Sequence, residues 1–127
     1  MKNKDYVSYE VAKILKEKGF NEYCSKEYHV GDAKKIHSVG EEYYNRSYDI
    51  ERNTDKKENK IAAPTLYEVQ KWMREIYDIK VMPRFFDEKN NYGFEIYLAR
   101  EWYCTHSNID SYEESLNAGI KEALSFL

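Results

Sequence analysis

The clearest repeat of apolar and polar positions runs from Ala62 to Ile79 and predicts an amphipathic α-helix. Its apolar side chains recur at helical spacing along one stripe, at Leu66, Val69, Trp72, Met73 and Ile76. Charged and polar side chains mostly occupy the opposite side, so a single face of the helix is expected to enter a core. Because Trp72 has the largest area to bury, we expect it at the centre of that core, as a packing residue.

The start of this helix is marked by its local sequence. Pro64 disfavours helical geometry in the residue before it, so the helix is expected to begin after the proline. Thr65 and Glu68 have the T-x-x-E spacing of a capping box, in which each side chain accepts a hydrogen bond from the other residue's backbone N–H.

A second, shorter helix is predicted at about residues 9–18. Ser8 is a suitable N-cap, and Val11, Ile14 and Leu15 give the segment an apolar face. Gly19 can take the left-handed conformation that ends a helix, and Phe20 is expected to cover that end.

A third helix is predicted after Ser111, which forms an S-x-x-E capping box with Glu114. Apolar residues then fall at spacings of three and four, at Tyr112, Leu116, Ile120, Ala123, Leu124 and Leu127. Gly119 costs about 1 kcal/mol relative to alanine inside a helix. A close contact between helix and sheet would explain its presence.

An antiparallel hairpin is the strongest strand prediction. Residues 79–85 and 94–98 each alternate apolar and polar side chains, and a polar turn cluster at 87–93 joins them. Pro83 cannot donate to a ladder, which places the first strand at an edge or a bulge. The second strand is expected to continue through Trp102 and Tyr103.

The region before the central helix has a weaker pattern. Residues 22–30 alternate imperfectly and predict a strand that ends in a Gly31-Asp32 turn. The aromatic stretch 41–50 is a further candidate strand. The charged run 51–60 predicts a flexible, solvated surface loop.

These elements predict an α+β fold in which about three helices pack on one face of an antiparallel sheet. A chain of 127 residues suits one domain, here residues 1–127, and buries about two-thirds of its unfolded surface at that size. The 42% hydrophobic and 34% charged content is typical of a soluble globular protein.

Charge and targeting signals narrow the function classes. A formal net charge of −3 argues against duplex nucleic acid as a partner, because phosphate contacts require clustered Lys and Arg. The N-terminus has no apolar signal region, and no apolar run approaches membrane-spanning length, so we expect a cytoplasmic protein. Cys24 and Cys104 are therefore expected to be reduced thiols.

Several segments resemble a group of short uncharacterised proteins encoded in phage and mobile-element DNA of gut bacteria. The segments are Ala63–Leu66 with Lys71–Glu75, the C-terminal stretch Ile109–Leu124, and the N-terminal YVSYEVAKILKEKGF before Cys24. Met73 stands where the group usually has leucine, which preserves packing volume. The resemblance omits residues 31–60 and supplies no catalytic or binding residues. It implies a cytoplasmic accessory protein.

Candidate chemistry is weak. Cys24, His29, Cys104 and His106 match the ligand count of a zinc site, but their C-x4-H and C-x-H spacings are poor. A nucleophilic site could use Cys104 with a histidine, or Ser107 with His106 and Asp110. Neither set comes with a strained elbow or a glycine-built oxyanion site. The adjacent pairs Glu41-Glu42 and Glu113-Glu114 need not face a shared cleft. We expect no catalytic residue, metal or cofactor.

The aromatic middle region is the stronger functional candidate. The chain has 13 tyrosines, and Tyr43, Tyr44, Arg46 and Tyr48 combine residue types that are enriched in interface hot spots. On an exposed strand they could add to the sheet edge of another chain, or they could simply cover their own sheet. The leading hypothesis is a small non-enzymatic protein that binds another protein, or a second copy of itself, through this region.

The alternative hypothesis is a single-stranded nucleic-acid binder that acts through the 43–57 region. Its exposed aromatic rings would stack on bases. Its basic residues would be Arg46, Arg52, Lys56 and Lys57.

Overall fold

The structure is a computed structural model that describes residues 3–41, 49–99 and 101–127, without the side chains of 104–107. It divides into two compact units, Met1–Thr65 and Leu66–Leu127, each of which contains helix and antiparallel sheet. The α+β class is therefore confirmed. The described strands form two three-stranded sheets, where the sequence predicted one sheet. That the chain is one domain stays a prediction.

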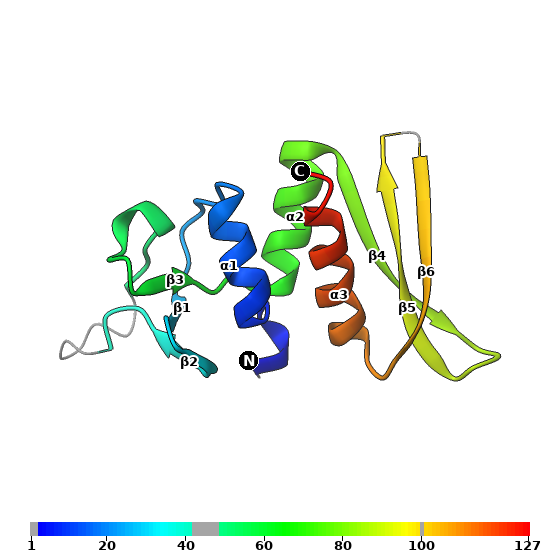
Figure 1. Cartoon of the computed structure of the whole chain (residues 1–127), viewed down its shortest axis with the longest axis horizontal. Helices are drawn as coiled ribbons and strands as arrows, with labels where there is room; N and C mark the ends of the chain where they lie inside the picture. Colours follow the sequence, from blue (N-terminus) through cyan, green and yellow to red (C-terminus); the bar gives the residue numbers. More distant parts are fainter. Residues whose placement is uncertain (1–2, 42–48, 100) are drawn as a thin grey trace. The chain divides into compact units, whose positions relative to one another are not determined.

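The first unit builds a small sheet in the order β2-β1-β3, with both pairings antiparallel. Its elements are η1 (Asn3–Asp5), α1 (Tyr9–Glu17), β1 (Lys26–His29), β2 (Asp32–Ser38), η2 (Asn53–Asp55) and β3 (Lys60–Ala62) (Figure 1). β1 is the central strand, so its backbone is paired on both sides.

The predicted ends of α1 are confirmed. The Val11 backbone N–H donates to the Ser8 hydroxyl at 3.3 Å, as an N-cap requires. Gly19 has a φ of 86°, and the Phe20 N–H donates to the carbonyl of Leu15 at 2.9 Å. This is the Schellman arrangement, and it places the Phe20 ring in the core.

The core of the first unit lies between α1 and the sheet. It contains Val7, Val11, Ala12, Leu15, Phe20, Tyr28 and Ile61. The Tyr28 ring lies edge-on to Tyr9 with 5.5 Å between centroids, and its hydroxyl donates to the Val7 carbonyl at 2.6 Å. Burial raises the pKa of Tyr28 above its ordinary value, which keeps this donor protonated.

Two expectations for the first unit need correction. β2 was not predicted, because its Ala33, Lys34 and Lys35 are exposed and supply no apolar alternation. The run 51–60 is not simply a solvated loop, because Asn53 is buried. Its amide donates to the Phe20 carbonyl at 2.8 Å and accepts from the Ala62 N–H at 2.9 Å.

The second unit has the order helix, three strands, helix. Its elements are α2 (Leu66–Tyr77), β4 (Ile79–Phe86), β5 (Asn91–Leu98), β6 (Glu101–Ile109) and α3 (Tyr112–Leu124). The sheet has the order β4-β5-β6, and α3 lies along one of its faces (Figure 1). We call the opposite side of this sheet the outer face.

The predicted hairpin is confirmed as β4 and β5, and Pro83 lies on an edge strand as expected. The predicted continuation of the second strand through Trp102 is wrong. Ala99 has a φ of 53°, and the chain reverses there into the separate strand β6. A positive φ at the first central residue is typical of a two-residue hairpin turn.

The glycine within the last helix is explained by close packing. A Cβ atom at Gly119 would lie 2.6 Å from Cγ1 of Val81 and 3.0 Å from Cγ of Phe94. Both neighbours are buried on the face of the sheet that α3 covers. The helix can approach the sheet this closely only because residue 119 has no side chain.

The predicted apolar faces are too wide at their margins. Ile76 and Tyr112 were placed on apolar helix faces, but they are 60% and 49% exposed. Trp72 is buried as predicted, yet Val69 and Met73 are more completely enclosed. Helical periodicity locates the centre of a face better than its borders.

Candidate functional site

The interaction surface predicted from the sequence, Tyr43, Tyr44, Arg46 and Tyr48, lies outside the described residues. It stays a prediction. The candidate functional groups that the structure does describe lie in two other places, one in each unit.

The candidate metal and nucleophile residues are not assembled by the described part of the chain. Cys24 is buried, and His29 lies at the end of β1. The side chains of Cys104, His106 and Ser107 are not described. Within the described ranges, no group of three or more His, Cys, Asp or Glu side chains gathers as a metal site.

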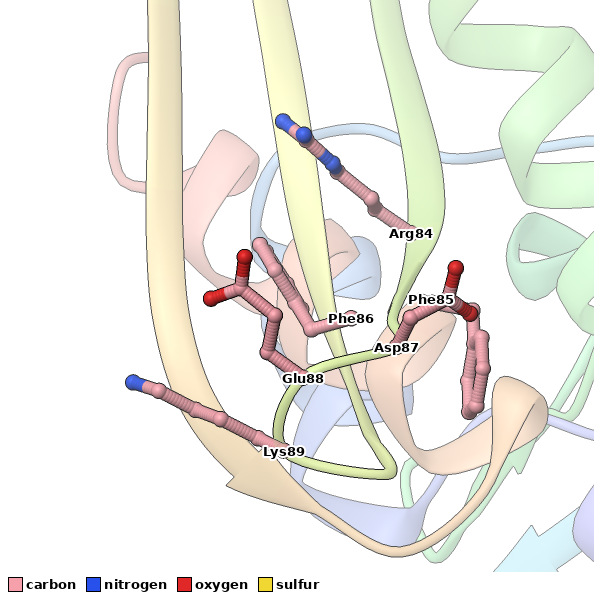
Figure 2. A pocket seen from close by; sticks show the side chains of 6 residues that line it. All are labelled: Arg84, Phe85, Phe86, Asp87, Glu88 and Lys89. Carbon is pink, nitrogen blue, oxygen red and sulfur yellow. The ribbon is translucent and has the colours of Figure 1, made fainter.

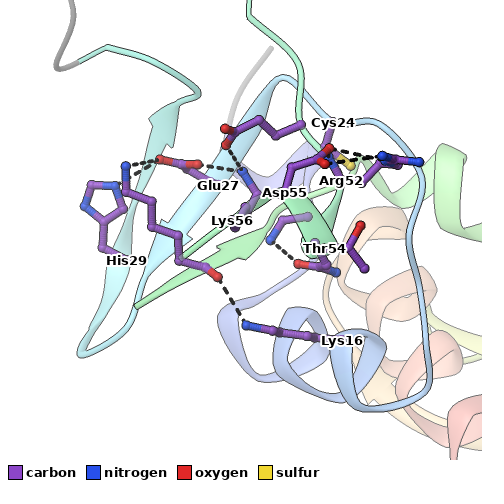
Figure 3. A network of polar contacts seen from close by, with 12 residues as sticks. Lys16, Cys24, Glu27, His29, Arg52, Thr54, Asp55 and Lys56 are labelled. Atoms are coloured by element: carbon purple, nitrogen blue, oxygen red, sulfur yellow. Dashed lines mark hydrogen bonds and ion pairs between the residues drawn. The ribbon is translucent and has the colours of Figure 1, made fainter. Parts of the chain in front are cut away.

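A buried ion network lies at the centre of the first unit (Figure 3). The Glu27 carboxylate on β1 is fully buried and contacts the Lys56 ammonium at 2.6 Å. Lys56 is equally buried and also contacts Glu51 at 3.0 Å. Lys60 and His29 approach the other Glu27 oxygen at 3.5 and 3.2 Å. The network ties the charged run 51–60 to the central strand, so its first role is structural.

Two histidines extend this polar cluster. The rings of His29 and His37 are stacked with 3.7 Å between centroids. His37 forms a hydrogen bond with Glu41, which lowers the pKa of that carboxyl below its ordinary value. Asp32 lies 3.7 Å from the other ring nitrogen of His37. The cluster joins β1 and β2 at their hairpin.

The second place is the outer face of the β4-β5-β6 sheet. Strand register sets Lys80, Tyr97 and Trp102 in one row, and Met82 and Glu95 in the next. Met82, Tyr97 and Trp102 are 48%, 37% and 54% exposed. In the described part of this unit, the packed helix α3 lies on the inner face only. The outer face therefore presents a strip of large apolar side chains.

Charged groups order this strip. Glu95 on the central strand accepts hydrogen bonds from the Tyr97 hydroxyl at 2.7 Å and from the Arg84 guanidinium at 2.9 Å. The pKa of Glu95 is lowered, chiefly by the Tyr97 hydroxyl, and the pKa of Tyr97 is raised by the same bond. The Tyr97 and Arg84 side chains are thus held in place by Glu95.

Replacing Tyr97 with phenylalanine should raise the pKa of Glu95 towards its ordinary value of 4.5, because the main hydrogen bond to the carboxylate is lost. A lowered folded-state pKa contributes stability above pH 4.5, and this contribution is lost as the pH falls through the folded-state value. The variant should therefore lose less stability on acidification. A carboxyl NMR titration measures the shift, and an unchanged Glu95 pKa would contradict the assigned bond.

A hollow of about 540 Å³ lies at the hairpin end of the outer face, lined by residues 84–89 (Figure 2). The Arg84 guanidinium lies over the Phe86 ring at 5.0 Å. Figure 2 shows the Phe85 ring turned away from Arg84 and Lys89. The lining residues are consecutive, from the end of β4 and the turn that follows it, and they carry both charge signs.

The sequence contained part of the signal for this surface. The alternation of Ile79 and Val81 with Lys80 and Met82 predicted a strand with two different faces. It did not show that no described helix of the second unit covers the second face, because that depends on which side α3 packs. Tyr97 and Trp102 form one surface with the charged residues beside them only because strand register brings these residues together.

No protein-family model matches the chain, and neither does a curated protein or a solved structure. None of the described helices combines the length and apolar character that crossing a membrane requires.

Proposed function

We propose that this chain is a small non-enzymatic interaction protein that binds another protein through the outer face of the β4-β5-β6 sheet. The observation that carries the proposal is the exposed strip of Met82, Tyr97 and Trp102, ordered by the Arg84–Glu95 ion pair. Aromatic residues, methionine and arginine are the types enriched in protein interfaces. Exposed apolar strips bordered by polar groups mark such sites.

Preorganisation favours binding at this face. Tyr97 and Arg84 are already hydrogen-bonded to Glu95, so less side-chain entropy is lost when a partner docks. Strands also hold the side chains at fixed spacing, which a loop would not do.

The charge of the second unit favours a protein partner over nucleic acid. Residues 66–127 contain eleven acidic and seven basic residues, and the carboxylate of Glu95 lies within the strip itself. Phosphate backbones would be repelled by this balance. The matching partner is a protein surface with an apolar centre and a basic rim.

The proposal retains the wider expectations from the sequence. A cytoplasmic accessory role in a phage or mobile element fits the resemblance of the helical segments and the absence of a recognised catalytic motif. The 43–48 region remains a second candidate surface, which the test below separates from the outer face.

The test begins with affinity capture from the host cell and then measures binding of the purified partner. A Tyr97→Ala/Trp102→Ala variant should weaken binding by about 30-fold or more, as expected for hot-spot residues. Tyr67→Ala is the matched control, because Tyr67 is 64% exposed on α2. If the Tyr43, Tyr44 and Tyr48 triple variant abolishes binding while the Tyr97/Trp102 variant retains it, the assigned surface is wrong.

The single-stranded nucleic-acid alternative loses part of its basic set. Lys56 is buried and paired with Glu27. Arg52 pairs with Asp55 at 3.2 Å and lies over the Tyr23 ring at 4.9 Å. A titration with labelled oligonucleotides at low salt tests this alternative directly.

A further inference from the structure

The two edges of the β4-β5-β6 sheet differ in their protection. β4 carries Lys80, Pro83 and Arg84, and charged residues and proline are the usual means of keeping an edge strand from pairing. β6 is nine residues long, and its only Asp, Glu, Lys or Arg is Glu101, at its first position. It contains no proline. The β5–β6 register shifts beyond Thr105, so the regular part of this edge is Glu101–Thr105, and this part carries neither a proline nor a bulge.

Strand register identifies the free backbone groups of β6. The pair Leu98 and Glu101 closes a two-residue turn, so these residues bond to each other across the hairpin. Antiparallel pairs then alternate between bonded and non-bonded. Tyr103 bonds to β5, whereas Trp102 and Cys104 direct their N–H and C=O groups towards the open edge.

The position of Pro83 supports the same assignment independently. Pro83 lies opposite Phe94 and has no N–H, so this pair is non-bonded in the β4–β5 ladder. Phe94 must then bond on its other side, to Thr105 of β6. The turn at Leu98 and Glu101 and the proline at Pro83 therefore predict the same alternation of bonded and non-bonded residues along β6.

We propose that β6 pairs antiparallel with β6 of a second copy of this chain. The pairing joins the β4-β5-β6 sheets of the two copies into one sheet of six strands. The contact is isologous: the same free groups of Trp102 and Cys104 face each other across a two-fold axis. The inference goes beyond the proposed function, because it uses the edge of the sheet and not its outer face.

Charge and length favour a second copy as the occupant. In an antiparallel pair centred on Tyr103, which sets Trp102 opposite Cys104, Glu101 lies opposite Thr105 of the other copy, so the two carboxylates stay apart. Two strands of equal length also satisfy the same number of free groups. Trp102 of each copy would lie on the outer face beside the new seam, which extends the apolar strip.

The test is sedimentation equilibrium of the whole chain at 1–100 µM with a reductant present. Wild type should sediment at twice 15.3 kDa. Cys104→Pro removes an outward N–H without removing a bond to β5, so this variant should stay folded by circular dichroism and sediment as a monomer. Cys104→Ala retains the N–H and should remain a dimer, as should Tyr97→Ala, whose change is confined to the outer face.

Amide exchange of wild type gives a second readout that needs no variant. The N–H groups of Trp102 and Cys104 should be protected at high concentration and become exposed on dilution, while that of Tyr103 stays protected. Wild type that sediments as a monomer at 100 µM would overturn the proposal. A folded Cys104→Pro variant that remains a dimer would overturn it as well, because association would then use another surface.

Discussion

Glu27→Gln should lower the free energy of unfolding of the first unit by about 3–5 kcal/mol, the usual cost of breaking a buried ion pair. Both side chains of the pair are fully buried, and the contact between Glu27 and Lys56 is 2.6 Å. The variant leaves Lys56 with the half-exposed Glu51 as its remaining carboxylate. An ammonium that is desolvated and only partly neutralised is the source of the expected loss.

The measurement should follow the first unit itself. Both tryptophans, Trp72 and Trp102, lie in the second unit, so their fluorescence does not follow the first unit directly. Urea unfolding monitored by hydrogen exchange of the β1 amides does report it.

The control variant Arg52→Gln breaks an exposed ion pair and should give no resolvable change in the free energy of unfolding. The double variant Glu27→Leu/Lys56→Met should recover much of the loss, because it removes both of the fully buried charges. A loss near zero for Glu27→Gln would show that the network is not desolvated.

Trp72→Ala should destabilise the second unit by about 3–5 kcal/mol, as is typical when a buried tryptophan is truncated. Trp72 is only 8% exposed, and its ring lies edge-on to Tyr77 with 5.2 Å between centroids. Truncation removes the buried indole and leaves a cavity that the helix cannot fully close.

Ile76→Ala is the matched control on the same helix. The sequence pattern placed Ile76 on the buried stripe, but it is 60% exposed, so its truncation should change stability by less than about 0.5 kcal/mol. Chemical denaturation followed by circular dichroism compares the two variants. Equal losses would mean that the predicted stripe is right and the observed exposure of Ile76 is wrong.

Local signals predicted the ends of elements well. Ser8 and Ser111 each accept the expected backbone hydrogen bond, and Gly19 adopts the left-handed conformation that ends α1. Pro83 lies on an edge strand, as its missing N–H required. These features depend on residues within a few positions of each other, so the sequence contains all the information that they need.

Long-range features were not predictable from the same chain. β2 has little apolar alternation and exists because β1 offers it a hydrogen-bonding edge. Lys56 appeared to be one more charge in a polar run, yet it is buried against Glu27, 29 positions away. No local pattern distinguishes such a lysine from a solvated one, because the distinction lies entirely in its distant partner.

The sequence by itself determined the three helices, the β4–β5 hairpin, the α+β class and the mild negative charge, because periodicity, caps and composition are local or additive properties. Only the tertiary structure decided that the described strands form two sheets, that a buried ion network joins 51–60 to β1, and that no described helix of the second unit covers the outer face of β4-β5-β6. These outcomes depend on which surfaces meet when distant segments pack. Packing removes water from some charged and apolar groups and leaves others exposed, and this selection is what creates a candidate site.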